Sequence, residues 1–170
     1  GDVWIISAAA DIGSTTTIGL ASNFAAVSAA IRWTEQSVAY PEIRSQWKAA
    51  GASESAVDVP MGPGNAWEVH AVSQRWSDAN TTNPIGNVSR GDTAGGSTPQ
   101  TVTPASVSVA AAGSAVLEVC GFTPNGNTGA AFTPSSGYTE IADIPGTSDQ
   151  CSLMAAYLLR GAGTETPGAI

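Results

Sequence analysis

Charged side chains are scarce in this sequence. Only 12% of its 170 residues are Asp, Glu, Lys or Arg, about half the share of an average soluble protein. The charged residues are mainly acidic, because six Lys and Arg stand against fourteen Asp and Glu, for a formal net charge of −8. Such a chain is not attracted to a nucleic-acid backbone or to an anionic membrane surface, so we expect neither partner.

The residue types that build common catalytic and metal sites are also few. The chain has one histidine, His70, and two cysteines, Cys120 and Cys151, whose spacing does not match a metal-ligand set. We interpret the cysteines as two buried thiols, with a single disulfide as the alternative. No GxSxG sequence is present and His70 stands alone, so we expect a surface histidine, no metal, no cofactor and no enzymatic activity.

Long apolar runs are absent too, and no stretch of eighteen apolar residues could span a membrane. The apolar residues instead form short runs rich in Val, Ile and aromatic side chains, which predict β-strands bounded by turn residues. These runs are 3–10, 66–76, 106–122 and 151–159. A further stretch, 132–144, is typical of a loop that leads into a strand.

Within 66–76, apolar and polar residues alternate, which predicts a strand with a buried apolar side and a polar side facing solvent. The apolar side would hold Trp67, Val69 and Ala71, and the polar side Glu68, His70 and Gln74.

Two other segments leave alternatives open. Residues 22–33 fit one or two helical turns and fit a strand as well. Residues 77–104 are crowded with Gly, Pro, Asn and Thr, and predict a long surface loop or a crossing between two sheets, with a domain linker as the alternative.

A weak internal repeat relates the two parts of the chain. The sequence GDVWIISA at 1–8 matches GSAVLEVC at 113–120, WTE at 33–35 matches YTE at 138–140, and WKAAGASES at 47–55 matches LLRGAGTET at 158–166. The order is the same in both copies. We therefore expect two related halves, 1–76 and 105–170, although chance similarity among such common small residues is the alternative.

Each half offers only a few strands with one apolar face, too little to fold alone. We therefore predict one all-β domain, a two-sheet β-sandwich of jelly-roll-like form in which the halves share a core and 77–104 joins them. The second half ends before a counterpart of the strand 66–76. The repeat thus suggests either truncated ends or edges that a neighbouring chain completes.

Several acidic residues are candidates for a catalytic or a calcium-binding site. Glu35 and Glu140 occupy equivalent places in the two halves, so we expect a structural task for them rather than glycoside hydrolysis. A calcium site is conceivable among acidic loop residues, although no DxDxDG spacing is present. Those loop residues are Asp78, Asp92, Asp143 and Asp149.

Five tryptophans are the largest apolar side chains of the sequence. Trp4, Trp47 and Trp67 lie within strand patterns and are expected in the core. Trp33 and Trp76 lie at junctions between strand and loop, where a ring could stack on a sugar or pack against another subunit.

Taken together, several segments resemble a β-sandwich module found in virion proteins of tailed bacteriophages. They are GDVWIISAAAD, QWKAAGASES, AWEVHAVSQRW, TPASVSVAAAGSAVLEVCGF and AAFTPSSGYTEIADI. The chain departs from that pattern at its ends and in the TPSSGYTE loop, where Ser135, Ser136 and Tyr138 stand in place of the common Pro and Trp or Met.

The resemblance implies a non-enzymatic structural protein of the virion surface, a capsid decoration or tail-associated component. Its partners would be capsid or tail subunits, in a homo-oligomer or a larger assembly. The alternative is a carbohydrate-binding module of a phage fibre or a bacterial secreted protein. Trp33, Trp76 and Tyr138 are the candidate contact residues for a partner or for a host glycan.

Overall fold

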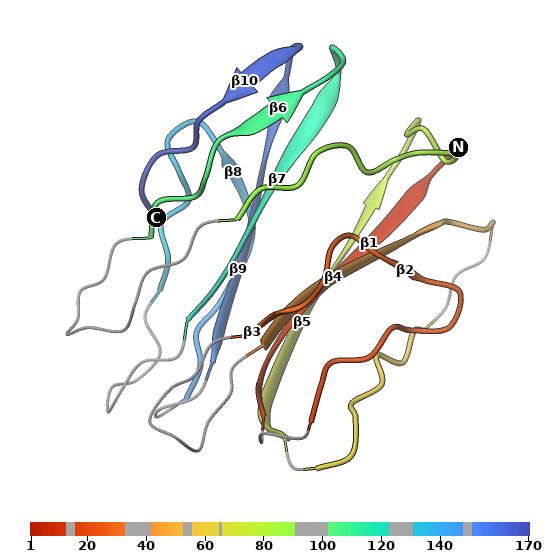
Figure 1. Ribbon diagram of the computed structural model, residues 1–170, viewed down its shortest axis with the longest axis vertical. Coiled ribbons are helices and arrows are strands. Elements are labelled where there is room, and N and C mark those ends of the chain that lie inside the picture. Colours follow the sequence, from red (N-terminus) through yellow and green to blue (C-terminus); the bar gives the residue numbers. More distant parts are fainter. Residues whose placement is uncertain are drawn as a thin grey trace.

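The computed structural model describes residues 1–12, 16–32, 42–52, 56–64, 66–90, 102–122, 131–147 and 151–170. These residues form ten β-strands and no helix, which confirms the predicted all-β fold (Figure 1). The strands are β1 (Val3–Ile12), β2 (Ala25–Ala26), β3 (Ile31–Arg32), β4 (Glu42–Ala49), β5 (Ala66–Trp76), β6 (Val107–Val109), β7 (Ser114–Phe122), β8 (Thr139–Ile144), β9 (Ser152–Arg160) and β10 (Gly163–Glu165). Within this part of the chain, no helix is available that could cross a membrane.

The first sheet is antiparallel and takes all its strands from β1 to β5. Its order is β2-β4-β1-β5, and β3 also pairs with β4. β1 is central, so that Val3 lies opposite both Ala49 of β4 and Trp76 of β5. β5 pairs with β1 along nearly its whole length and forms one edge of the sheet.

The second sheet has three antiparallel strands in the order β7-β9-β8. β9 is central, with Tyr157 opposite both Leu117 of β7 and Thr139 of β8. The short strands β6 and β10 form a separate two-stranded ribbon. Every described strand pair is antiparallel, which suits sheets whose outer faces carry loops rather than crossover helices.

The two sheets pack face to face, as expected for a β-sandwich (Figure 1). Ala9 of β1 packs with Cys151 and Leu153, and all three side chains are fully buried. Ile43, Val72 and Val119 complete this cluster from β4, β5 and β7. The inter-sheet core therefore draws on strands from both parts of the chain.

β1 is buried on its second face as well. Ala8, Ala10 and Ile12 pack against Ile18 of the segment that follows β1, and Met61 adds to the same cluster. The three consecutive alanines at 8–10 are each 0% exposed, because small side chains let neighbouring layers approach β1 from both sides.

Buried polar side chains attach this covering segment to the first sheet. Glu42 accepts a hydrogen bond from the backbone N–H of Ile18 (2.8 Å), and Gln46 accepts one from the N–H of Ala21 (2.7 Å). Both side chains lie on β4 and are buried, because their oxygens satisfy loop amides that have no strand partner.

The outer face of the second sheet is covered in the same manner. Cys120, Met154 and Ala156 form its buried cluster, against which Phe132 and Ile170 pack. The backbone of Ile170 exchanges two hydrogen bonds with that of residue 102 (2.9 and 3.3 Å), so the last described residues lie along this layer.

The strand predictions fit the structure closely, with one division. β5 has the predicted bounds, β1 extends two residues further than predicted, and β9 is shifted by one residue. The run 106–122 splits into β6 and β7 at a turn where Gly113 adopts a φ of 77°. The helical alternative for 22–33 is wrong over 22–32, where β2 and β3 form. Residues 77–90 cross from the first sheet toward the second, as one of the predictions for 77–104 required (Figure 1).

The jelly-roll-like connection and the internal repeat remain predictions. Each sheet takes its strands from one part of the chain. In the first sheet β1 pairs antiparallel with β4, and in the second sheet their counterparts in the repeat, β7 and β9, also pair antiparallel. The third matched element, 33–35, lies outside the described residues.

Candidate functional site

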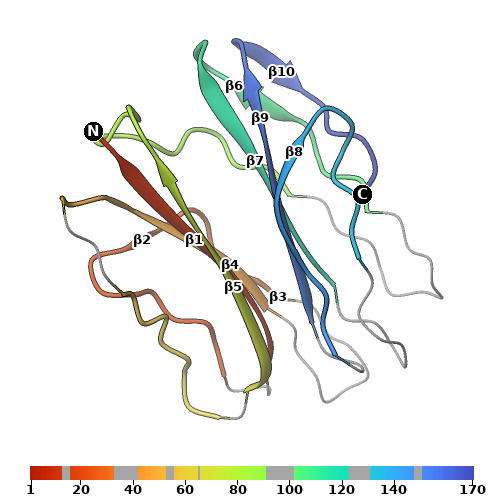
Figure 2. The same ribbon diagram turned by 180° about the vertical axis from the view of Figure 1, so that it is seen from behind.

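The edge strand β5 has several exposed side chains among its described residues. It pairs with β1 along one side, with a register shift between Glu68 and Ala66, and on its other side none of the described strands pairs with it. In Figure 2, β5 of the first sheet and β8 of the second sheet both lie toward the viewer. The outward-facing side chains include Val69, which is 44% exposed, and the exposed Ala71 and Ser73. A long edge with small neutral side chains is suited to pairing with another strand.

The two faces of β5 are the reverse of the sequence prediction. Val69 and Ala71 face outward, whereas Gln74 is 7% exposed and Val72 packs into the inter-sheet cluster. Because side chains alternate along a strand, Glu68 and His70 share this inner face. His70 is therefore not a surface histidine, and its side chain is 14% exposed. The side chain of Trp67 lies outside the described part.

Glu68 is the centre of a polar cluster between the two sheets. It accepts hydrogen bonds from the backbone N–H of Thr147 (3.1 Å) and from the Thr147 hydroxyl (3.2 Å). Its Oε1 lies 3.4 Å from Nε2 of His70, but without the geometry of a hydrogen bond. The thiol of Cys151 donates to the Glu68 carbonyl oxygen at 3.7 Å. These contacts tie β5 to the segment that precedes β9.

Asp11 lies opposite Glu68 in the β1–β5 pairing and is 3% exposed. Its Oδ1 accepts no hydrogen bond from the described residues. Burial raises the pKa of the Asp11 carboxyl, and the negative charge of Glu68 raises it further. This carboxyl therefore holds a proton more readily than an exposed aspartate does.

The two cysteines are free thiols, which confirms the first of the two sequence predictions for them. Cys151 is 0% exposed and Cys120 is 7% exposed. Burial raises the pKa of each thiol to about 12, with Glu68 adding to the effect at Cys151 and Glu118 at Cys120. Since the thiolate is the nucleophile, a cysteine with this pKa is a poor one.

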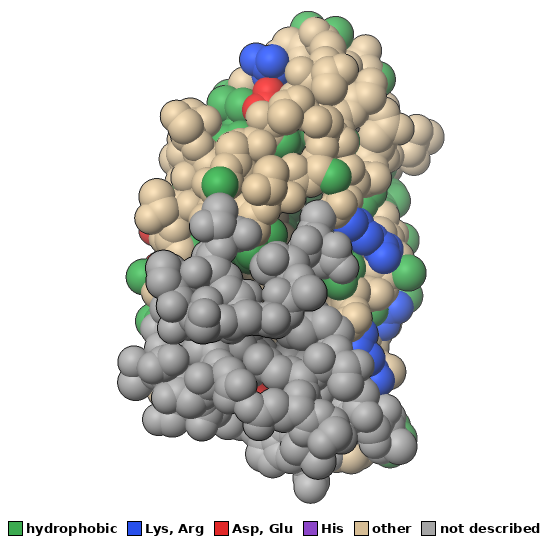
Figure 3. All heavy atoms as spheres, turned by 60° about the vertical axis from the view of Figure 1, so that its left-hand side comes forward, with side chains coloured by type: hydrophobic (Ala, Val, Ile, Leu, Met, Phe, Trp, Pro, Cys, Tyr) green, Lys and Arg blue, Asp and Glu red, His purple; other side chains and the backbone are tan. Residues whose placement is uncertain are grey.

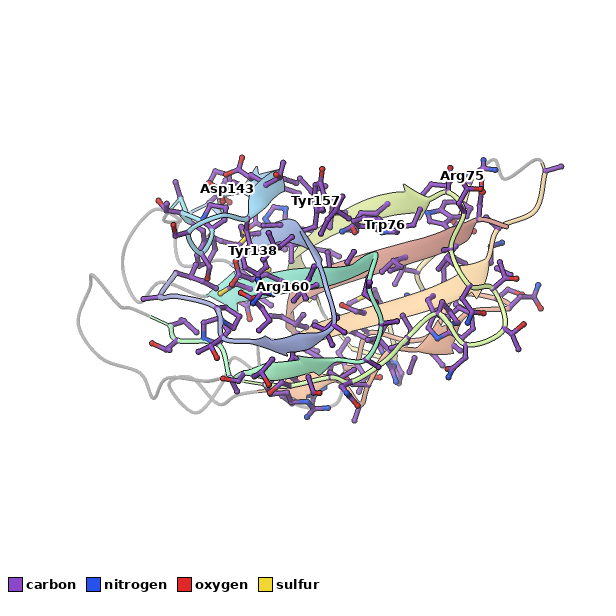
Figure 4. All side chains as sticks on the ribbon, turned by 90° about the horizontal axis from the view of Figure 1, so that it is seen from above. Arg75, Trp76, Tyr138, Asp143, Tyr157 and Arg160 are labelled. Atoms are coloured by element: carbon purple, nitrogen blue, oxygen red, sulfur yellow. The ribbon has the colours of Figure 1, made fainter. Side chains whose placement is uncertain are left out.

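Trp76 ends β5, and its ring is engaged in packing. It meets Tyr157 of β9 edge to face, with ring centroids 5.3 Å apart and an interplanar angle of 80° (Figure 4). Its indole N–H donates to Gln74 at 3.3 Å. Trp76 therefore connects the two sheets at the opposite end of β5 from Glu68. Only part of its ring is available to a ligand.

Tyr138 lies on the outer face of the second sheet, in a turn that ends at the start of β8. Its ring packs on the cluster of Cys120 and Met154, and its buried hydroxyl finds no hydrogen-bond partner among the described residues. Figure 4 places Arg160 beside it, and Arg160 forms an ion pair with Glu165 at 2.8 Å. Burial raises the pKa of Tyr138 to about 12, with Glu165 and Glu118 contributing and Arg160 opposing.

The turn before Tyr138 is fixed by a buried polar network. The backbone N–H of Ser135 donates to Glu118 at 3.1 Å, and the Ser135 hydroxyl lies 2.7 Å from Glu118 Oε1 and 2.9 Å from the carbonyl oxygen of Gly168. Gly137 adopts a φ of 89°, and the Tyr138 N–H donates to the Ser135 carbonyl, as a turn with a glycine at its third position requires.

The remaining candidates are dispersed. Trp33 and Glu35, and likewise Asp92 and Asp149, lie outside the described residues. Glu140 is exposed on β8, and Asp143 accepts a hydrogen bond from the Phe132 N–H at 3.2 Å. The described residues contain no group of three His, Cys, Asp or Glu side chains arranged to hold a metal.

An open cavity of about 450 Å³ lies at the end of β4, a place that no sequence pattern indicated. It is lined by Asn23, Ala25, Trp47, Lys48, Ala49, Gly51 and Thr81. These residues come from three separate parts of the chain. Trp47 was expected in the core, and that expectation did not predict a cavity.

Charged side chains are few, at 12% of the sequence. Figure 3 shows one face of the molecule, on which most of the visible Lys and Arg side chains follow one border and few Asp or Glu side chains are seen. Contacts on such a surface would depend on shape, apolar area and backbone pairing more than on ion pairs.

Comparison with known proteins gives no relative: no family model, no curated protein and no solved structure matches this chain.

Proposed function

We propose that this chain is a non-enzymatic structural protein of a bacteriophage virion surface, a capsid decoration or a tail-associated component. It would act through protein–protein contacts made by the β5 edge, in a homo-oligomer or a larger assembly. The open pairing edge of β5 is the observation that carries the proposal, and the sequence resemblance supplies the virion context.

The composition of β5 supports strand addition as the mode of contact. In an added strand the backbone hydrogen bonds supply affinity, while pockets for alternate side chains supply specificity. The side chains of Val69, Ala71 and Ser73 are small or neutral and leave room for a strand beside β5, and the exposed Arg75 is already paired with Asp2 at 2.7 Å. Natural proteins commonly protect free edges with lysines, and β5 contains none.

The polar cluster behind β5 supports the same proposal. Glu68 and its contacts to Thr147 and Cys151 hold the strand against the second sheet, so the edge is presented in a fixed position. Fixing a strand before it binds lowers the entropy lost on binding. The buried, protonated state expected of Cys151 at neutral pH gives this cluster a structural use rather than a nucleophilic one.

The carbohydrate-binding alternative has weaker support at the residues first considered for it. Trp76 packs on Tyr157 and Tyr138 packs on the Met154 cluster, so neither ring lies flat on the surface as a free platform.

Purified particles test the proposed function. Virions from the phage that carries this gene should contain the chain at a fixed ratio to the major capsid protein or to a tail subunit, as measured by quantitative mass spectrometry. The ratio should persist after a wash at 1 M salt, where the Debye length falls to about 3 Å and exposed ion pairs are screened. Absence of the chain from washed particles would rule the proposal out.

A further inference from the structure

The cavity at the end of β4 is bounded by three segments that are distant in sequence. β2 begins at Ala25, opposite Trp47 of β4, because the chain before it turns at Asn23, which has a φ of 64°. The loop after β5 passes on the other side and contributes Thr81. The cavity therefore lies beside the last residues of β4, and Trp47 is among its lining residues.

The lining combines one large aromatic ring with small neutral groups. Trp47 is the aromatic residue of the lining, positions 25, 49 and 51 carry alanine or glycine, and Asn23 and Thr81 carry an amide and a hydroxyl. An amide both donates and accepts hydrogen bonds, and so does a hydroxyl. The depression is open to solvent and has a volume of about 450 Å³.

The charges around the cavity disfavour an anionic ligand. Lys48 is the one basic residue of the lining, and its ammonium lies 5.2 Å from the ring centroid of Trp4 and 5.1 Å from that of Phe24. Its charge is thus directed at aromatic faces. The chain as a whole carries a formal charge of −8, which repels anions.

We propose that this cavity binds a neutral saccharide unit, with one sugar face on the Trp47 ring and its hydroxyls on Asn23 and Thr81. An aromatic ring with an adjacent amide and hydroxyl matches a ligand that has an apolar C–H face and a polar rim. The site is separate from the β5 edge, so it adds a ligand-binding activity to the proposed assembly function and does not depend on it.

Isotope-labelled protein titrated with galactose, glucose and N-acetylglucosamine tests the proposal by NMR. At least one sugar should shift the Trp47 indole signal together with the Asn23 and Gly51 amides. No shift with any of the three sugars, even at concentrations on the order of 100 mM, would overturn the proposal, because that range reveals even a millimolar site. Shifts confined to Trp76 or Tyr138 would overturn it as well.

Variants separate the contribution of each group. Trp47→Ala should lower the affinity at least tenfold, while Trp47→Phe, which keeps an aromatic face, should stay within about threefold. Asn23→Gly removes the amide but tolerates the positive φ, so it should lower the affinity about three- to tenfold, the range expected for one hydrogen bond. Trp76→Phe is the control and should bind normally.

Should Trp47→Ala prove unfolded by its NMR spectrum, Trp47→Phe and Asn23→Gly still decide the matter. Unchanged affinity in Asn23→Gly together with loss in Trp76→Phe would contradict the proposed site.

Discussion

Gly121 of β7 and Ile43 of β4 touch across the interface of the two sheets. A Cβ atom built on Gly121 would lie 2.5 Å from Cδ1 and 2.8 Å from Cγ1 of Ile43. Ile43 belongs to the cluster that contains Ala9 and Leu153, so it has little space to move aside. The spacing of the two sheets at this point therefore depends on the absence of a side chain at position 121.

Replacing Gly121 with alanine should destabilise the protein. We expect the free energy of unfolding to fall by about 1–3 kcal/mol, the usual cost of forcing extra volume into a packed core. Gly86→Ala is the matched control, because no atom lies within 4 Å of a Cβ at that position. Chemical denaturation measures both variants, and equal stability of the two would show that the sheets are not in contact at Gly121.

Asp11 should make the stability of the protein depend on pH. Its pKa is raised in the folded state, so the folded protein binds the proton more tightly than the unfolded chain does. The stabilising contribution of the protonated carboxyl is complete below the ordinary value of 3.8, and it is lost as the pH rises through the raised pKa.

Asp11→Asn, which keeps the shape but cannot ionise, should therefore have a higher Tm than the parent at pH 7. The difference should shrink as the pH falls through the raised pKa of Asp11 and should be smallest below 3.8. Thermal unfolding of both proteins from pH 3 to pH 8 measures this. A Tm difference that does not vary with pH, or a less stable variant at pH 7, would show that ionised Asp11 does not destabilise the folded protein.

The two thiols should resist alkylation in the folded protein. With a pKa of about 12, only about one thiol in ten thousand is ionised at pH 8, against about a quarter for an ordinary cysteine of pKa about 8.5. Iodoacetamide should modify Cys120 and Cys151 at least a hundredfold faster in denaturant than in buffer, as followed by mass spectrometry. Rapid labelling of either residue in the native protein would contradict its burial.

Ser135→Ala should destabilise the outer layer of the second sheet. The substitution removes a hydroxyl that bonds Glu118 and leaves the buried carboxylate with fewer donors, a loss that costs about 1–3 kcal/mol. Ser136→Ala changes the adjacent exposed residue and should leave the unfolding free energy within about 0.5 kcal/mol of the parent. If both substitutions change the free energy of unfolding equally, the hydrogen bonds of Ser135 do not stabilise the protein.

The β5 edge permits a matched pair of variants. Val69 on β5 is 44% exposed and Val88 in the crossing loop is 47% exposed. Val69→Lys should reduce association with particles at least tenfold, because a lysine on a free edge opposes strand pairing, whereas Val88→Lys should bind as the parent does. Both should change stability by no more than about 0.5 kcal/mol. Similar particle binding by the two variants would exclude this side of β5 from the interface.

The sequence was informative where apolar residues form compact runs. The strands at Val3–Ile12 and Ala66–Trp76 follow from such runs, because buried strands need them and turn residues end them. β4 did not stand out, since Glu42 and Gln46 look like surface residues until the loop amides of Ile18 and Ala21 are placed beside them. Buried polar groups depend on partners that only the tertiary structure supplies.

The same reason explains the reversed faces of β5. Hydrophobicity placed Val69 inside and His70 outside, but the segment carrying Thr147 and Cys151 provides polar contacts for the inner face, at Glu68. The cavity at Trp47 could not be predicted either, because its walls come from segments around residues 23, 49 and 81 that no local pattern connects.

Hydrogen exchange along β5 tests the central claim most directly. Backbone amides of residues 66–76 should be compared in the free protein and in the particle-bound protein by mass spectrometry. If β5 receives a partner strand, its outward-pointing amides should exchange at least tenfold more slowly on the particle, while the segment 77–90 changes little. Protection that appears elsewhere on the chain and leaves 66–76 unchanged would contradict the proposed interface.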